Sequence, residues 1–411
     1  MRCSLEKSIK FGRNRTTEQS GESTGRSNDA SERTAIKLTR WKVLALKFLV
    51  APLACLALTV ALLELSLPLL YPRFAGFFRL SLTAASLNRD NAHRFFSSDK
   101  FDPELGWDNQ PTARNYVATK PYLAQAYGDS FVYGAEVGRD ETWQAHFERL
   151  TGEAIVNRGV GGYGLDQAVL KFEKYARHSP TRLAILGLHR ESFRRVLSYY
   201  SYYYFRSNES AFIFKPIVVK RDGQFEVLRP PCTDAVCFLE VVSNPQHEVW
   251  QWLAHYDYWY QTNKEKPVPE FPHTIAYLRV LPQILRARLR QPGMEHYFVN
   301  ADALEVVKYL IEWFVHTSQD LGMTPVCVIL HSPADLRVIK DGMRFDDELL
   351  QFLAARGILY VDTAPYILAQ YRHDDHFQAL RAPQGHLNGR GNRIVAEALA
   401  QGLASMGLLG H

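Results

Sequence analysis

The chain of 411 residues has little cysteine, no metal-ligand spacing and almost no charge imbalance outside its first segment. Five cysteines are too few for a disulfide-built scaffold, and none stands at the spacing of a zinc site. Residues 1–42 hold ten Lys/Arg and five Asp/Glu, which accounts for the whole net charge of +5. The near-neutral remainder lacks the basic surface that nucleic-acid binding needs. We therefore expect no metal and no nucleic-acid partner.

Nucleotide-binding signals are also weak. No Gly-Lys-Ser/Thr follows the glycine-rich stretch, so a P-loop is excluded. The stretch Gly159-x-Gly161-x-x-Gly164 does match the dinucleotide fingerprint, but the region about twenty residues later carries only Arg182 as a charge. A dinucleotide loop, a plain tight turn and a loop that offers backbone N–H groups to a ligand are the alternatives, and we expect no cofactor.

One long hydrophobic run lies near the N-terminus. From Phe48 to Leu70 the only charged residue is Glu64, and the run is about long enough to cross a ~30 Å hydrocarbon layer. The alternative is a secretory signal sequence, but the run is too long and no small-x-small cleavage site follows it. We predict a single transmembrane helix over residues 43–71.

The flanks of this helix predict its orientation. Residues 1–40 are rich in Ser, Thr, Arg, Glu and Gly, which is typical of a disordered tail. More Lys/Arg precede the helix than directly follow it, so the N-terminus should be cytoplasmic. The main domain is then expected in the periplasm or outside the cell, joined to the membrane through residues 43–71 and a connector over 73–120.

The remaining cysteines fit an exported protein. Cys232 and Cys237 are five residues apart in a proline-bounded loop, where an oxidising compartment would permit a disulfide. Two free thiols are the alternative. Cys327 lies in an apolar, strand-like run and is interpreted as a free buried thiol.

Beyond residue 120 short apolar runs alternate with amphipathic stretches. Strand-length runs occur at 122–127, 154–157, 183–188, 325–330 and 358–362, and helix patterns occur at 141–150, 165–176, 301–321, 345–355 and 392–406. This alternation predicts an α/β domain over 121–408, with a parallel sheet covered by helices on both faces. In such sheets ligands bind outside the carboxyl ends of the strands.

The alternation stops between residues 197 and 300. Aromatic residues gather there, first at 199–205 and again at 250–260. An inserted subdomain whose aromatics pack on the main sheet is the simplest interpretation. A platform for sugar rings and an element at the membrane interface are the functional alternatives.

A single serine follows the first predicted strand. The run 122–127 ends abruptly in Gly128-Asp129-Ser130, and a helix pattern follows shortly. Such a junction exposes a hydroxyl at the carboxyl edge of a buried strand. Serine becomes a nucleophile only when a base takes its proton and donors receive the oxyanion. His386, in the loop before the final helix, is the candidate base, and a helix-capping surface histidine is the alternative.

Three sequence blocks together resemble the SGNH/GDSL hydrolase superfamily, and 101–107 is similar to bacterial membrane-anchored members. The blocks are Gly128-Asp129-Ser130, Asn157-x-Gly159-x-x-Gly162 and His386-x-Asn388-x-x-Gly391. The resemblance covers about 120–405, with 197–300 as an insertion. It implies a three-layer α/β/α flavodoxin-like fold, action on ester or O-acyl groups, Ser130 as nucleophile, His386 as base, and an oxyanion hole from the N–H groups of Ser130 and Gly162.

The chain departs from the family pattern at two positions. His189 occupies the place of an asparagine that completes the oxyanion hole, and it is the candidate replacement donor. Loss of one such donor costs about 10²–10³ in rate. Gln384 and Pro383 occupy the places of the triad aspartate. Asp374 or Asp375 is the candidate acid, and a Ser–His dyad is the alternative; removal of the aspartate's charge from a triad costs about 10⁴.

These residues support two hypotheses. The first is an exported, membrane-anchored esterase, deacetylase or O-acyl transferase that acts on an acylated small molecule or glycan. The second is a weakly active or inactive relative that binds glycan or assists polysaccharide assembly. His331 ends another strand-like run, as His189 does, and we expect both at the rim of the site. Asp129 and His331 are the candidate substrate-binding residues.

Overall fold

The computed structural model describes residues 26–82, 88–108, 121–207, 212–289, 298–371 and 376–409. It divides into two compact units. The first is the N-terminal segment to Tyr71 together with Phe271–Ile275, and the second comprises Pro72–Glu270 and Ala276–His411. The predicted disordered tail, residues 1–40, lies partly outside the described residues. From Arg26 onward that tail is part of helix α1.

The second unit contains a five-stranded parallel sheet. Its strands are β3 (Ala124–Tyr127), β4 (Ile155–Asn157), β5 (Leu183–Leu188), β8 (Thr324–Ile329) and β9 (Tyr360–Asp362). They lie side by side in the order β4-β3-β5-β8-β9, and every neighbouring pair is parallel. Counted along the chain this is the order 2-1-3-4-5, which is flavodoxin-like. The prediction of a flavodoxin-like α/β sheet is therefore confirmed.

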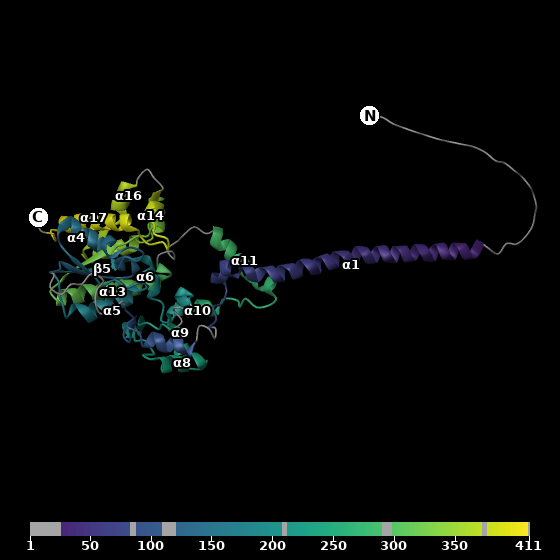
Figure 1. Cartoon of the computed structure of the whole chain (residues 1–411), viewed down its shortest axis with the longest axis horizontal. Helices are drawn as coiled ribbons and strands as arrows, with labels where there is room; N and C mark the ends of the chain where they lie inside the picture. The colour runs from purple at the N-terminus through teal and green to yellow at the C-terminus, as the bar shows by residue number, and fades with distance from the viewer. Residues whose placement is uncertain are drawn as a thin grey trace, which may run out of the picture. The chain divides into compact units, whose positions relative to one another are not determined.

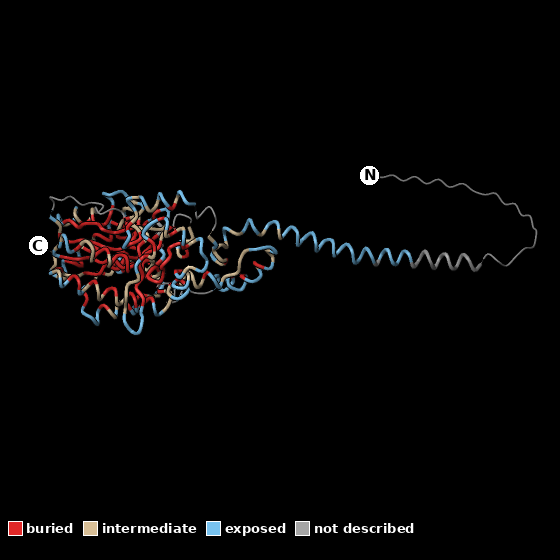
Figure 2. The backbone as a smooth tube through the Cα atoms, turned by 90° about the horizontal axis from the view of Figure 1, so that it is seen from below, coloured by how far each residue is buried: buried red, intermediate tan, exposed pale blue. Residues whose placement is uncertain are grey.

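Helices cover both faces of this sheet (Figure 1). One face bears α5 (Leu165–Ala176) and α13 (Ala301–Asp320), and the other bears α4 (Trp143–Thr151) and α17 (Gly389–Ser405). Each layer has its own apolar core, and Figure 2 shows the buried backbone, in red, concentrated in the interior of the second unit. All five strands lie where the apolar runs predicted them, and the three central strands β3, β5 and β8 are buried over most of their length.

Shorter elements connect these layers. The helices are α2 (Arg89–Phe96), α3 (Ser130–Tyr133), α6 (Arg190–Arg195), α14 (Pro333–Lys340), α15 (Asp347–Ala355) and α16 (Ala364–Gln370), with 3₁₀ turns at Ala75–Phe77, Arg139–Glu141 and His376–Leu380. In the predicted connector, β1 (Phe101–Asp102) and β2 (Gly106–Trp107) form a small antiparallel hairpin. Lys174 of α5 binds the Asp102 carboxylate at 2.8 Å, so the hairpin is fixed to the main domain.

The predicted insertion is a helical subdomain with one hairpin. Its elements are α7 (Ser201–Phe205), β6 (Ile217–Arg221), β7 (Gln224–Leu228), α8 (Ala235–Ser243), α9 (Glu248–Tyr256), α10 (Tyr258–Lys264) and α11 (His273–Leu289). Four of its tyrosines are buried in a third apolar cluster: Tyr199, Tyr200, Tyr202 and Tyr203. Aromatic packing is therefore the main role of this tyrosine run.

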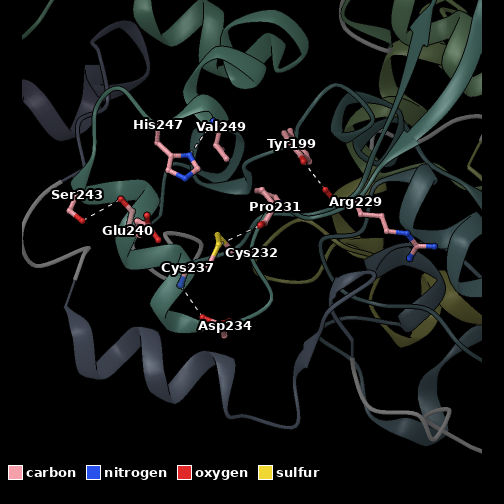
Figure 3. Close-up of a disulfide and its surroundings, with 10 residues drawn as sticks. All are labelled: Tyr199, Arg229, Pro231, Cys232, Asp234, Cys237, Glu240, Ser243, His247 and Val249. Atoms are coloured by element: carbon pink, nitrogen blue, oxygen red, sulfur yellow. Dashed lines mark hydrogen bonds between the residues drawn. A yellow bond between two sulfur atoms is a disulfide. The ribbon is translucent and has the colours of Figure 1, made fainter.

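A disulfide closes the loop before α8 (Figure 3). Cys232 and Cys237 have Cα atoms 5.4 Å apart, a normal separation for a disulfide. Asp234, between them, accepts a hydrogen bond from the Cys237 backbone N–H at 2.9 Å and thereby begins the helix. Cys327 is free and fully buried in β8, as predicted.

The first unit is dominated by one long helix, α1 (Arg26–Phe74). The helical stretch from Thr39 to Phe77, which comprises most of α1 and the short 3₁₀ turn after it, has a mean hydropathy of 2.3 and is long and apolar enough to cross a membrane. Large apolar side chains along it are exposed, including Phe48 and Leu69. Glu64, the only charge in the apolar run, accepts hydrogen bonds from the backbone N–H groups of His273 and Thr274 at 2.5 and 2.8 Å.

Candidate active site

Ser130 is the first residue of α3, directly after the carboxyl end of β3. Asp129 caps this helix by accepting a hydrogen bond from the Phe131 N–H at 2.9 Å. The turn is tight because a Cβ at Gly128 would lie 2.4 Å from Val132 Cγ2, so only glycine fits there. Ser130 is 8 % exposed and lines a cavity of about 650 Å³ at this edge of the sheet.

The glycine turn after β4 is fixed against α3. A Cβ at Gly159 would lie 2.3 Å from the backbone nitrogen of Tyr133, so the two backbones touch. Asn157 bridges them: its amide donates to the Tyr133 carbonyl at 3.1 Å and its oxygen accepts from the Gly159 N–H at 3.1 Å. The second sequence block therefore holds α3, which begins at Ser130, in place.

Gly162 lies in the same turn with φ +81°, in the left-handed region that favours glycine. Within the described part of the chain, neither its backbone N–H nor that of Ser130 has a protein acceptor. Trp107 of the connector hairpin donates to the Gly161 carbonyl at 3.0 Å, and Tyr163 donates to the Trp107 carbonyl at 2.6 Å. The connector thus fixes the turn that carries Gly162, the second candidate oxyanion donor.

His386 lies in the loop before α17. Asn388 caps that helix by accepting from the Gly391 N–H at 3.1 Å, and its amide donates to the Ala379 carbonyl at 2.7 Å. An antiparallel bridge between Arg381 and Leu387 closes the base of the loop. This framework explains the His-x-Asn-x-x-Gly spacing: it places the imidazole in the cavity that Ser130 lines.

A carboxylate contacts the His386 ring, and it is one that the sequence did not indicate. Glu136 Oε2 lies 2.5 Å from His386 Nδ1. The same carboxylate accepts hydrogen bonds from the backbone N–H groups of Gln384 at 2.6 Å and His386 at 3.2 Å. The Glu136 side chain is 11 % exposed. Glu136 thus occupies the place of a triad acid, whereas Asp374 and Asp375 lie outside the described residues.

Several contacts keep Glu136 in its ionised form. Burial alone would raise the pKa of this carboxyl, but the hydrogen bonds from Gln384 and His386 and the charge of His386 lower the pKa below its usual value. The backbone of Glu136 is left-handed, with φ +68°, just after the left-handed cap Gly134. Such a conformation is costly for a residue other than glycine and is found where surrounding contacts impose it.

Ser130 and His386 face the same cavity without a direct bond. Among the hydrogen bonds of the described residues, none joins Ser130 Oγ to the His386 ring, while the Phe131 ring lies 5.1 Å from that of His386, centroid to centroid. Hydrogen bonds of this kind are commonly long in unliganded enzymes and tighten when substrate binds. The arrangement therefore brings Ser130 and His386 to one cavity, with Glu136 in contact with the His386 ring.

His189 also lines the cavity, but its ring is 1 % exposed and both its nitrogens face carboxylates. Nδ1 lies 3.2 Å from Asp129 Oδ2, and Nε2 lies 3.8 Å from Asp335 Oδ2. The ring stacks on Phe131 with centroids 3.7 Å apart. Burial alone would raise the pKa of Asp129, but His189 and Arg195 lower it. These contacts make His189 and Asp129 a buried support for the start of α3.

His331 lies away from the cavity lining. Its ring is fully buried, and Nε2 is 3.0 Å from Asp362 Oδ1. Asp362 also binds Arg344 at 2.8 Å. Burial alone would raise the Asp362 pKa, but the histidine and the arginine lower it to about 2. The structure therefore brings Ser130, His189 and His386 to one cavity and places His331 in a separate buried ion pair.

The insertion contributes one wall of the cavity. Three of its aromatic side chains line it: Tyr204, Phe205 and Trp259. Arg195 lies beneath two of these rings, 5.3 Å from the Tyr204 centroid and 5.4 Å from the Phe205 centroid. Arg194 lies 5.4 Å from the Trp259 ring. The aromatic residues that the sequence left unassigned therefore divide into a buried cluster and a cavity wall.

Comparison with known proteins gives only distant structural matches. No family model and no curated protein matches the chain by sequence. The structure is similar to a putative lipolytic protein of the G-D-S-L family from Desulfitobacterium hafniense, with 11 % identity, a TM-score of 0.35, and coverage of 68 % of this chain and 98 % of that one. An acetylxylan esterase from Geobacillus stearothermophilus matches at 11 % identity and TM-score 0.35, covering 70 % of this chain and 96 % of its own. Because the sequence identities and TM-scores are this low, the assignment of the site rests on the geometry described above and not on these matches.

Proposed function

We propose that this protein is a serine ester hydrolase of the SGNH type that acts on O-acyl groups. The observation that carries the proposal is the 2.5 Å contact of Glu136 with Nδ1 of His386, whose ring lines the same cavity as Ser130. A histidine oriented by a carboxylate and facing a strand-end serine is the arrangement that activates a hydroxyl. It supplies the acid that the family's usual position lacks in this chain.

The chemistry follows from these positions. His386 Nε2 takes the proton of Ser130 Oγ as that oxygen attacks the acyl carbonyl, and Nδ1–H donates to Glu136, which stabilises the imidazolium. The bond between the carbonyl carbon and the alcohol oxygen then breaks, and His386 returns the proton to the leaving alcohol. Water attacks the acyl-serine by the same route and releases the carboxylic acid.

The oxyanion that forms needs donors at the edge of the sheet. The backbone N–H groups of Ser130 and Gly162 are the proposed donors, since neither has a protein acceptor among the described residues. His189 faces Asp129 and Asp335 with its two nitrogens. We therefore propose a hole of two backbone donors, with His189 holding Asp129 and the start of α3.

The substrate is proposed to be an acylated carbohydrate. Aromatic rings pack against the apolar faces of sugars, and the wall of Tyr204, Phe205 and Trp259 offers such rings beside the nucleophile. A sugar hydroxyl that replaced water in the second step would make the protein an O-acyl transferase. The ratio of free acid to acylated acceptor formed from an acetylated oligosaccharide separates the two.

The proposed location is the outer side of a membrane. Helix α1 has the length and hydropathy of a membrane span, and the disulfide between Cys232 and Cys237 is typical of an oxidising compartment. The excess of Lys/Arg before the span favours a cytoplasmic N-terminus. The main domain is then periplasmic or extracellular, where acylated envelope glycans are available.

The test is covalent labelling of the full-length protein in detergent by a fluorophosphonate probe. Wild type should be labelled and should hydrolyse short acyl esters, and Ser130→Ala should lose both, with a drop in rate of about 10⁴-fold or more.

A matched control is available in the same cavity. Ser332 also lines it, but its hydroxyl donates to Asp335 at 2.6 Å. Ser332→Ala should therefore keep labelling and activity. Persistent labelling of Ser130→Ala would reject Ser130 as the nucleophile, and a wild type that binds acetylated glycan without labelling or hydrolysis would favour a non-catalytic glycan-binding protein.

A further inference from the structure

Helix α11 carries an unusual outer face. Five large apolar side chains on it are exposed by 43–83 %: Ile275, Leu278, Leu281, Leu285 and Leu289. Their spacing of three or four residues places them on one stripe of the helix. The opposite stripe, at Ala276, Val280 and Ile284, is buried. The helix therefore has two apolar faces, and the protein covers only one.

Charges flank the exposed stripe, and all of them are positive. Arg279 and Arg286 lie along one side of the stripe and Arg288 along the other, at 100° per residue. The helix contains no Asp or Glu. Arginine side chains can extend from such flanks toward anionic headgroups while their stems cover apolar surface. An apolar stripe with basic borders is the pattern of a helix that lies in a membrane interface.

The start of α11 is bound to the membrane-spanning helix. Glu64, inside the apolar run of α1, accepts hydrogen bonds from the N–H groups of His273 and Thr274, the first residues of α11. Both belong to the same compact unit as α1. Phe271, two residues earlier, is 76 % exposed. A carboxylate in an apolar span is costly, and it is retained here as the partner of this helix start.

We propose that α11 binds the surface of the bilayer that α1 spans, with its leucine stripe among the acyl chains and its arginines at anionic headgroups. This rests on the proposed membrane anchoring and not on ester hydrolysis. A lipid surface fits better than a protein partner, because the helix begins at a residue of the span and its charges are all of one sign. The segment then ties the insertion, and with it the aromatic cavity wall, to the membrane.

The test places a spin label on the full-length protein in vesicles that contain one quarter phosphatidylglycerol in phosphatidylcholine. Cys3, Cys55 and Cys327 are replaced by Ser, and one new cysteine is introduced, as Leu285→Cys or, for comparison, Gln283→Cys. Gln283 is exposed on the same helix but lies beside the buried stripe. The label at 285 should be accessible to oxygen and protected from a water-soluble nickel complex, and the label at 283 should show the reverse.

A third label, on the native Cys55, separates the two proposals. Cys55 lies in the apolar run of α1, so oxygen access there without nickel access establishes the span by itself. A protected Cys55 with a nickel-accessible position 285 would overturn the α11 proposal and leave the anchoring intact. Dipolar broadening at 285 would instead assign the stripe to a second copy of the chain. Protection that is unchanged in pure phosphatidylcholine would reject the role of the arginines.

Discussion

Two histidine–carboxylate pairs contribute a ring to the cavity that Ser130 lines, and they differ in exposure. In the outer pair, His386 and Glu136 have side chains 22 % and 11 % exposed. In the inner pair, His189 and Asp129 have side chains 2 % and 1 % exposed. The pairs have the same chemical groups, so burial and surroundings decide what each can do.

The outer pair has one partner for Nδ1 and a free path to the cavity for the rest of the ring, so its imidazole can exchange a proton with Ser130 or a leaving alcohol. The inner ring is buried against Phe131, with Nδ1 facing Asp129 at 3.2 Å and Nε2 facing Asp335 at 3.8 Å without a hydrogen bond among the described residues. The position of a histidine in the sequence therefore does not decide its role. What decides it is whether the second ring nitrogen faces the open cavity or a buried carboxylate.

The largest expected effect comes from the outer carboxylate. Glu136→Gln removes the charge that stabilises the His386 imidazolium and should lower kcat for ester hydrolysis by about 10³–10⁴-fold, by analogy with loss of the triad acid's charge. Substrate binding should change little, because Glu136 is absent from the cavity lining. Steady-state kinetics with a short acyl ester measures both.

Asp374→Asn and Asp375→Asn are the matched controls for that change, since they are the carboxylates that the sequence favoured. Both should retain wild-type kcat. If either loses activity while Glu136→Gln keeps it, the outer pair is not the catalytic one and the comparison fails.

The inner pair should matter more for stability. His189→Ala leaves the buried Asp129 carboxylate without its ring partner at 3.2 Å, and removing one partner of a buried charged pair costs about 3–5 kcal/mol. His386→Ala, at the exposed pair, should cost under about 1 kcal/mol. Denaturant unfolding of the full chain in detergent measures both. An unchanged free energy of unfolding in His189→Ala, together with lost activity, would assign His189 to the oxyanion instead.

The fold could be predicted because its signals are local. Each of the five apolar runs became a strand of the sheet, and the amphipathic stretches at 165–176 and 301–321 became α5 and α13. The disulfide also joins cysteines only five residues apart. Ser130 and His386 were found because glycine and asparagine spacings mark the turns that carry them.

The acid could not be predicted because no local pattern marks it. Glu136 and His386 are 250 residues apart, and the carboxylate is held by backbone N–H groups, which every residue type except proline supplies. The only sequence signal for this acid is its place: Glu136 lies three residues after the short helix that Ser130 begins, and Gly134 ends that helix. The roles of His189 and of the aromatic residues depended likewise on which neighbours the tertiary fold supplied.

The smallest expected effect is on the pH dependence of stability, and it comes from a buried carboxylate that, unlike those of the two pairs, has no histidine partner. Asp257 is fully buried and accepts backbone N–H groups of Tyr199, Tyr200 and Tyr260, each at 2.8 Å. Burial raises its pKa to about 6, despite those hydrogen bonds. The folded chain therefore binds this proton below about pH 6, and the unfolded chain binds it only below about pH 4.

From this difference the free energy of unfolding should rise by about 2–3 kcal/mol through Asp257 as the pH falls from 7 to 4. Asp362, whose pKa is lowered to about 2, contributes in the opposite direction, because its stabilisation is lost only as the pH falls below about 4 toward 2. Urea unfolding gives the free energy of unfolding of wild type and Asp257→Asn at pH 7, 5 and 4, and the difference between the two pH dependences isolates the contribution of Asp257. Equal pH dependences would mean that Asp257 stays ionised, and that three backbone donors stabilise a buried carboxylate as well as a histidine does.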